Sequence, residues 1–319
     1  MKTVQLFLFL IISQLAVTNV FANGSCFSFL PYGYNEFFVH LPKNESFCVD
    51  TPDGVVHYET DKLGARIIKG QKFGTSISGF GESQLLEIFP NKKPNGHALK
   101  HLYGDSDIQI HGAPNNGPYE TLEYLKYFLR LKIPKKIVIG FNFGTDLFRI
   151  IPGWKTKDRV LLKSDDLSKV MSFPFYYETK IAFNLFFGGS IEKTNPEGMF
   201  LKMRESYSNN LKIIEKNYKG YLETFLNFSQ SKHLSMDFII FPPFWSYQNQ
   251  NGNSYLNKNI WNKFKKFVCK KRFIEKTIFE NIYIVKYAEK GRTNKMFTYD
   301  LRHFLVPPTS FIKKKQFCL

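Results

Sequence analysis

The sequence predicts an α/β fold in which a mostly parallel central sheet is the middle of three layers, α/β/α. Three observations predict it: short apolar runs recur along the chain, amphipathic stretches separate them, and the connections are long enough for crossovers between parallel strands. Of the 319 residues, 43% are hydrophobic and 34 are phenylalanine, which is enough for a substantial core. No internal repeat or low-complexity linker is visible, so one domain is favoured over two.

Residues 1–22 have the three parts of an export signal. Lys2 is the positive residue, and Leu6 to Val17 is mostly apolar. The small residues Val20 and Ala22 predict cleavage after Ala22. An uncleaved membrane anchor is the alternative, but two polar residues interrupt the apolar run and it is shorter than a membrane span. We therefore expect a soluble mature chain that is secreted or periplasmic.

Residues 23–66 are predicted to form an irregular or short-stranded N-terminal segment, since prolines and glycines interrupt strand-like pieces such as Val55–Tyr58. The main domain is predicted over residues 67–319. In chain order, its expected elements are a strand within 67–80, a helix over 83–89 stopped by Pro90, a strand over 107–111, a helix over 118–131, strands over 136–142 and 238–241, a helix over 257–272 and a strand over 282–285.

The helix over 118–131 is predicted by Pro118 at its start and by Leu122, Leu125 and Phe128 on one face. The run KIVIGFN over 136–142 is typical of a strand buried on both faces. Residues from about 147 to 235 do not fit the alternation of strands and helices. They are predicted to form an insertion or cap with a Lys- and Glu-rich helix, about 198–228.

The four cysteines indicate disulfides rather than a metal site. Their number is even, as is usual in exported chains, and four cysteines permit three pairings. Proximity in sequence favours Cys26 with Cys48 and Cys269 with Cys318. No CxxC or His-rich spacing accompanies them, so no metal is expected.

The chain is strongly basic, with 44 Lys and Arg against 27 Asp and Glu and a net charge of +17. Such a charge favours transient contact with an anionic polymer or an anionic membrane surface. The alternative is a compositional bias, since Lys, Asn, Phe, Ile and Tyr are all frequent. No nucleic-acid-binding motif is present, so nucleic acid is not an expected partner.

The first loop with candidate chemistry is Gly79-Phe80-Gly81-Glu82-Ser83. A serine in a glycine-flanked turn between a strand and a helix is exposed at the sheet edge, where backbone N–H groups can stabilise negative charge. The alternative interpretation of Ser83 is an ordinary N-cap serine, which such turns often contain.

Two further regions complete the candidate chemistry. Near the C-terminus, Asp300 precedes His303 by three residues, so the carboxylate can orient an imidazole that acts as a general base. A chance pair in a solvated loop is the alternative, because the chain has seven histidines. The loops 111–117 and 141–146 each follow a predicted strand and offer oxyanion donors. Their alternative interpretation is turn chemistry, since both are rich in Asn and Gly.

Taken in order, these residues resemble the SGNH, or GDSL-type, hydrolase family over about residues 57–305. The correspondence lies in Gly81-Glu82-Ser83 for the first block, Gly112 for the second, Ile137–Arg149 for the third and Asp300 with His303 for the closing Asp-x-x-His; the segment His57–Arg66 resembles a lead-in seen in exported bacterial members. Two departures are visible. Glu82 stands where aspartate is usual, and Thr145 stands where the third block has asparagine when Asp146 is aligned with its aspartate.

The resemblance implies a role for each of these residues. Ser83 is the nucleophile, His303 the general base and Asp300 its orienting carboxylate. The Ser83 and Gly112 N–H groups, with Asn142 or Thr145, form the oxyanion hole. It also implies no metal or organic cofactor.

The function expected on this basis is that of an exported serine esterase or O-acyltransferase acting on acyl esters of a polysaccharide, with acetyl as the expected acyl group. The aromatic segments 151–154 and 243–247 can stack on sugars or simply pack. One alternative is a catalytically inactive protein that binds carbohydrate or a polyanion. Another is a lipase-like enzyme at a membrane surface, attracted through the Lys-rich segment 263–276 and Lys313–Lys315.

Overall fold

The fold is taken from a computed structural model, which describes residues 26–27, 30–31, 33–34, 39–51, 53–69, 72–88, 93, 96–104, 106–113, 116–142, 146, 212, 216, 220, 223–225, 227–241, 258–270, 279–285 and 311–319. The predicted export signal, Thr145, Asp300 and His303 lie outside these residues, as do the two aromatic segments and most of the predicted insertion over 147–235. Within the described ranges, no helix is long and apolar enough to cross a membrane.

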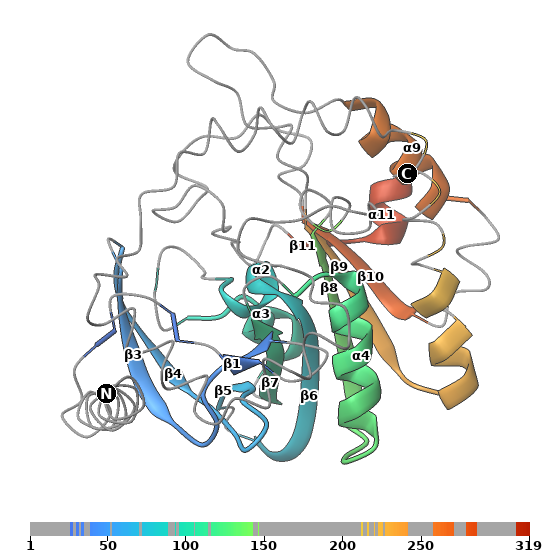
Figure 1. Cartoon of the computed structure of the whole chain (residues 1–319). Helices are drawn as coiled ribbons and strands as arrows, with labels where there is room; N and C mark the ends of the chain where they lie inside the picture. The colour runs from blue at the N-terminus through green and yellow to red at the C-terminus, as the bar shows by residue number, and fades with distance from the viewer. Residues whose placement is uncertain are drawn as a thin grey trace, which may run out of the picture.

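The structure is mixed α/β with a central sheet of seven strands, in the order β11-β10-β9-β8-β6-β7-β5 (Figure 1). The inner strands run parallel to one another, and the two edge strands are antiparallel to their neighbours. The parallel strands are β6 (Lys72–Glu82), β7 (Ser106–Ala113), β8 (Lys136–Asn142), β9 (Met236–Phe241) and β10 (Phe279–Val285); the edges are β5 (Arg66–Ile68) and β11 (Phe311–Lys313). The predicted α/β class and mostly parallel sheet are thus confirmed.

The two central strands β8 and β9 are buried because their sequences are almost wholly apolar. In β8, every residue after Lys136 is buried, and in β9 all are. The register pairs Ile139 with Phe238, so large apolar side chains lie side by side across the sheet. Strands of this kind need cover on both faces, which is why a continuous apolar run predicts them.

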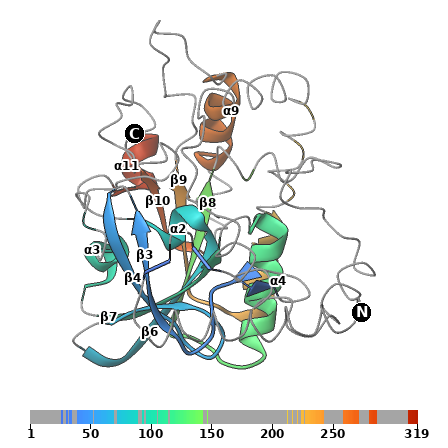
Figure 2. The same cartoon turned by 60° about the vertical axis from the view of Figure 1, so that its left-hand side comes forward.

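Successive residues of β6 contact two helices that lie on opposite faces of the sheet. Gly79 and Gly81 lie beneath Leu85 of α2 (Ser83–Leu86). Phe80 points the other way, in contact with aromatic rings of α4 (Pro118–Leu129). Figure 2 also shows α3 (Leu99–Tyr103) and α4 on opposite sides of the sheet.

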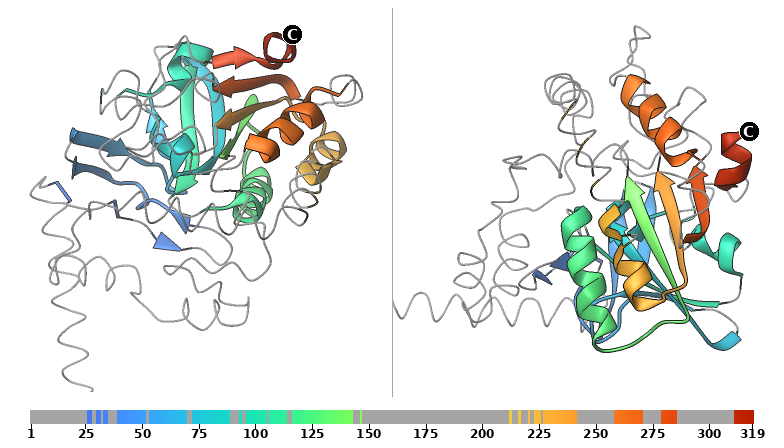
Figure 3. Two further views of the ribbon diagram at one scale, coloured as in Figure 1. Left: turned by 90° about the horizontal axis from the view of Figure 1, so that it is seen from above. Right: turned by 90° about the vertical axis from the view of Figure 1, so that its right-hand side faces the viewer.

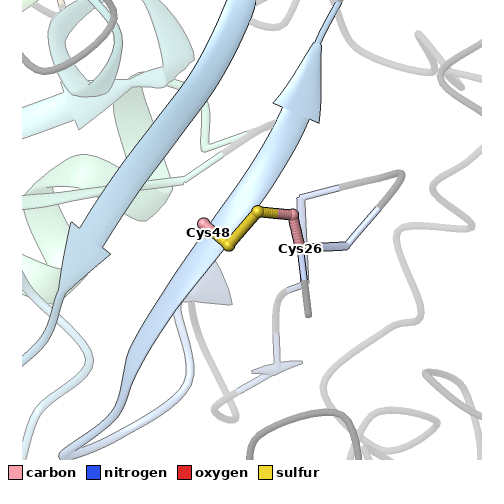
Figure 4. Close-up of a disulfide and its surroundings, with 2 residues drawn as sticks. All are labelled: Cys26 and Cys48. Atoms are coloured by element: carbon pink, nitrogen blue, oxygen red, sulfur yellow. A yellow bond between two sulfur atoms is a disulfide. The ribbon is translucent and has the colours of Figure 1, made fainter. Parts of the chain in front are cut away.

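The N-terminal segment folds into two small two-stranded sheets, as its short strand-like pieces suggest. One pairs β1 (Gly33–Tyr34) with β2 (Val39–His40), and the other pairs β3 (Ser46–Thr51) with β4 (Gly54–Glu59). The disulfide between Cys26 and Cys48 fastens the start of this segment to β3 (Figure 4). A second disulfide joins Cys269, just after α9 (Lys258–Val268), to Cys318 in α11 (Lys314–Cys318). Both pairings agree with the prediction from sequence proximity.

The amino-terminal ends of β9 and β10 share a buried polar network. Asp237, which is fully buried, accepts hydrogen bonds from the Tyr103 hydroxyl at 2.8 Å and from the backbone and side-chain nitrogens of Asn281 at 3.1 Å. The Lys136 ammonium lies 3.5 Å from the same carboxylate. These partners satisfy a charge whose burial is otherwise costly, so the network stabilises the sheet at this end.

Candidate functional site

The sheet has a topological switch point between β6 and β8. After β6 the chain passes to β7 on one side, whereas after β8 it passes to β9 on the other. In open parallel sheets, ligands bind outside the carboxyl ends of the strands at such a point. The residues that end β6 and β8 therefore mark the candidate site, and they are Glu82, followed by Ser83, and Asn142.

Ser83 is the first residue of α2, and Glu82 occupies the N-cap position with extended backbone. The Glu82 side chain makes no capping hydrogen bond. Ser83 is therefore not an N-cap serine, which removes the ordinary explanation for a serine in this turn. Ser83 is only 8% exposed, and its hydroxyl makes no hydrogen bond to any residue that the structure describes.

Glycines allow α2 to lie directly on the sheet. A Cβ at Gly140 would lie 3.0 Å from the Leu85 Cβ, and one at Gly81 would lie 3.2 Å from the same atom. Leu85 is fully buried over these glycines. Because these positions have no side chains, Leu85 packs directly on the strands. This packing sets the distance between the sheet and the turn that carries Ser83.

Asn142 and Glu82 connect the two strands across the switch point. The Asn142 Nδ2 donates a hydrogen bond to Glu82 Oε1 at 2.5 Å, and both residues are buried. The Asn142 backbone N–H donates to Asp146 Oδ2 at 2.8 Å, so that carboxylate closes the turn after β8. Glu82 and Asp146 therefore fix the side chain and the backbone of Asn142.

Gly112 lies at the same edge, beside the last residues of β6. The register pairs it with Gly81. A Cβ at this position would lie 3.0 Å from the Gly81 carbonyl oxygen and 3.3 Å from that of Glu82, so the backbones approach closely because residue 112 is glycine. Of the predicted site residues, the structure brings Ser83, Gly112 and Asn142 together at one edge; Asp300, His303 and Thr145 lie outside the described residues.

The carboxyl end of α2 is held by two buried basic side chains that the sequence pattern did not mark as functional. Arg66 Nη1 donates to the Leu86 carbonyl oxygen at 2.8 Å, and Arg66 is only 3% exposed. His97 Nε2 lies 2.9 Å from the Leu85 carbonyl oxygen. The last carbonyls of a short helix have no intrahelical partners, and these two side chains supply partners for those of Leu85 and Leu86.

Aromatic and acidic groups complete the surroundings of Arg66. Its guanidinium lies 4.6 Å from the centre of the Tyr58 ring, and the Tyr58 hydroxyl donates to Glu87 Oε1 at 3.0 Å. Burial lowers the pKa of Arg66, while Tyr58 and Glu87 act in the opposite direction. The N-terminal strand β4 is thus linked to the helix that carries Ser83.

A tight turn delivers Arg66 to this position. Asp61 Oδ1 accepts hydrogen bonds from the N–H groups of Leu63 at 2.8 Å and Ala65 at 3.0 Å. Gly64 has a φ of +74°, and a Cβ there would overlap the Leu41 carbonyl oxygen, so only glycine fits. The Asp-Lys-Leu-Gly spacing was the one sequence signal that could have indicated a structured turn before Arg66.

The described histidines do not supply a base to Ser83. All seven except His303 lie in the described part of the chain, and none of these hydrogen-bonds to Ser83. Both ring nitrogens of His97 are engaged, with Leu85 and with the backbone N–H of Leu99, and burial lowers its pKa to about 3.

His111 lies on the opposite face of the sheet, within an aromatic cluster. Its ring stacks on Phe80 with centroids 4.7 Å apart and contacts the rings of Tyr124 and Phe128. Neither ring nitrogen has a hydrogen-bond partner among the described residues. Burial, followed by the nearby charge of Lys132, lowers the pKa of His111 to about 3. It is a neutral core residue.

The described residues contain no group of three or more His, Cys, Asp or Glu side chains placed to hold a metal ion. In comparisons with known proteins, no protein-family model and no curated protein matches the chain.

Proposed function

We propose that the chain is an exported serine esterase or O-acyltransferase of SGNH type, with a three-layer α/β/α core. The observation that carries this proposal is the position of Ser83. It follows β6 directly at the switch point, with Gly112 and Asn142 at the same edge. The resemblance of the sequence blocks to the SGNH family supports the same assignment, and the parallel order of β7, β6, β8, β9 and β10 is compatible with it.

In the proposed reaction, the Ser83 oxygen attacks the ester carbonyl carbon while His303 accepts the hydroxyl proton. Asp300 orients the imidazole and stabilises its charged form. The tetrahedral intermediate then collapses, the bond to the alcohol breaks, and His303 returns the proton to the leaving oxygen. An acyl-Ser83 remains. Water or a sugar hydroxyl attacks it in the same way and releases the acid or the new ester.

Asn142 is the better oxyanion donor of the two that the sequence offers. It is the last residue of β8, and its amide is held by Glu82, the residue before Ser83. An amide N–H is a donor of the kind that stabilises an oxyanion, and the Asn142 amide lies at the strand end that Ser83 also occupies. Glu82, with its longer side chain in place of the usual aspartate, then acts as the group that orients this donor.

The proposed substrate is an O-acylated polysaccharide outside the cytoplasm. The family resemblance indicates this class, and the two disulfides agree with an oxidising compartment. A site at strand ends can accept a short acyl group that projects from a polymer, whereas a lipase needs a large apolar pocket for its acyl chain.

The test is hydrolysis of p-nitrophenyl acetate and labelling by a fluorophosphonate probe, with Ser83→Ala and His303→Ala as the decisive variants. Exposed Ser231→Ala and His233→Ala serve as matched controls. We expect both signals to vanish in the first pair and to persist in the second. A folded wild-type chain that neither labels nor hydrolyses any ester, with or without an acetylated polysaccharide as acceptor, would contradict the proposal and favour a non-catalytic binding protein.

A further inference from the structure

A disulfide brings together two lysine-rich segments that are distant in sequence. Residues 258–270 and 311–319 contain neither Asp nor Glu but eight lysines: Lys258, Lys263, Lys265, Lys266, Lys270, Lys313, Lys314 and Lys315. Among the seven lysines whose side chains the structure describes, five are exposed. Four of the five lie within five residues of Cys269 or Cys318, and we call these four the lysine platform: Lys266, Lys270, Lys313 and Lys315.

The two segments are fastened to each other by covalent and non-covalent contacts. The disulfide between Cys269 and Cys318 joins the end of α9 to α11. Nearby, the Lys265 ammonium lies 4.2 Å from the centre of the Phe317 ring. The positions of the platform lysines are therefore set by the fold and not by two independent tails.

The orientation of α9 is set by its apolar side. Phe264 and Phe267 are buried, at 0% and 5% exposure, and so anchor one side of the helix in the core. Lys263 and Lys266 are exposed three residues apart on this helix, and Lys270 is exposed just beyond its end. Like charges this close repel one another, and an anionic partner that binds here reduces that repulsion.

The platform lies at the functional end of the sheet. Figure 1 and the right-hand view of Figure 3 show α9 beyond the carboxyl ends of β8 and β9, with α11 beside it. This is the end at which Asn142 finishes β8 and Ser83 follows β6.

The chemistry of the surface favours a polymer over a membrane. A helix that binds a bilayer surface inserts its apolar face into the lipid. In α9, Phe264 and Phe267 instead face the protein core, and Phe317 of α11 is also buried. The exposed side offers ammonium groups, which suit carboxylate or sulfate groups repeated along a chain.

We infer that the lysine platform binds an anionic polysaccharide. This inference rests on the proposed function only for the catalytic step that follows binding. In that step, Ser83 would act on acyl esters carried by an anionic polymer. Binding itself requires no catalysis and is measured on Ser83→Ala protein.

The experiment measures binding of polygalacturonate to Ser83→Ala protein by isothermal titration, with dextran as the uncharged comparison. The platform variant changes Lys266, Lys270, Lys313 and Lys315 to Gln. A matched variant changes four exposed lysines elsewhere, Lys43, Lys62, Lys135 and Lys232, and so has the same net charge. We expect the platform variant to lose affinity roughly tenfold or more and the matched variant less than about twofold.

Equal losses in the two variants would overturn the inference, because binding would then depend on net charge alone. Binding of dextran as strong as that of polygalacturonate would also overturn it, as would tighter binding to phosphatidylglycerol vesicles through the same lysines. Two separate readouts distinguish the two proposals. Hydrolysis of p-nitrophenyl acetate by a platform variant that retains Ser83 tests the esterase alone, while polygalacturonate binding tests the platform alone.

Discussion

Asn142 and Glu82 join the ends of strands β8 and β6 through a hydrogen bond of 2.5 Å from the amide to the carboxylate. The bond crosses the switch point of the sheet immediately before Ser83. Because both side chains are buried, the bond is shielded from water and orients the amide strongly. In the proposed reaction, this bond is the reason to favour Asn142 over Thr145 as the oxyanion donor.

Asn142→Ala is expected to lower kcat for p-nitrophenyl acetate by roughly a hundredfold with little change in KM, as loss of one oxyanion donor does. Thr145→Val, which removes the competing donor, should leave kcat within about threefold. Steady-state kinetics on the two variants, with circular dichroism to verify folding, distinguish them. The opposite ranking would show that Thr145 is the donor.

Arg66→Gln is expected to lower the free energy of unfolding by about 2–4 kcal/mol, since the Leu86 carbonyl loses its buried donor. The esterase kcat should fall as well, because the same bond holds the helix that carries Ser83. Arg66→Lys should recover part of both losses. Urea unfolding and kinetics provide the two measurements.

The matched control for that variant is Arg130→Gln, which changes an exposed arginine just after α4 and should alter stability by less than about 0.5 kcal/mol. A loss of stability in Arg66→Gln without any change in kcat would mean that Arg66 supports the fold but does not position Ser83.

Acid is expected to destabilise the protein through the buried His97 and His111 and the half-buried His40. Burial is the largest cause of a lowered pKa in each, to about 4 for His40 and about 3 for His97 and His111. Below about pH 6.5 the unfolded chain binds protons that the folded chain does not, so stability falls as pH falls from about 6.5 toward 4. Each histidine contributes about 1.4 kcal/mol per pH unit in that window.

His111→Phe removes one of these groups while retaining an aromatic ring. Between about pH 6 and 4.5, the slope of the unfolding free energy against pH should decrease by the contribution of about one bound proton. Urea unfolding at several pH values measures this slope. Phe80→Leu disturbs the same aromatic cluster without removing a titrating group and should keep the wild-type slope. An unchanged slope in His111→Phe would show that His111 titrates normally in the folded protein.

The two disulfides should differ in their contribution to stability. Cys269 and Cys318 are 49 residues apart, whereas Cys26 and Cys48 are 22 apart. Loop-closure entropy predicts losses of about 4 and about 3 kcal/mol on replacing each pair by serines. Calorimetry of the two double variants tests the order. The reverse order would mean that contacts in the N-terminal segment outweigh the difference in loop entropy.

The sequence by itself determined the main strands and helices of the sheet domain. KIVIGFN corresponds to β8 over the same residues, Lys136–Asn142, because a continuous apolar run between polar ends has one stable place in an α/β fold. Pro118 likewise begins α4 as predicted. The predicted helix over 83–89 is shorter, ending at Leu86, since Arg66 and His97 take the carbonyls at its end.

The common position of the candidate residues Ser83, Gly112 and Asn142 could be predicted from the sequence, because each lies at or next to the end of a strand and parallel strands place such positions at one end of the sheet. Only the tertiary structure decided that Glu82 orients Asn142, that Arg66 and His97 hold α2, and that a disulfide joins the lysine-rich segments 258–270 and 311–319. These relationships join residues far apart in the chain. Periodicity and local propensity report only neighbours along the sequence, so they cannot contain such contacts.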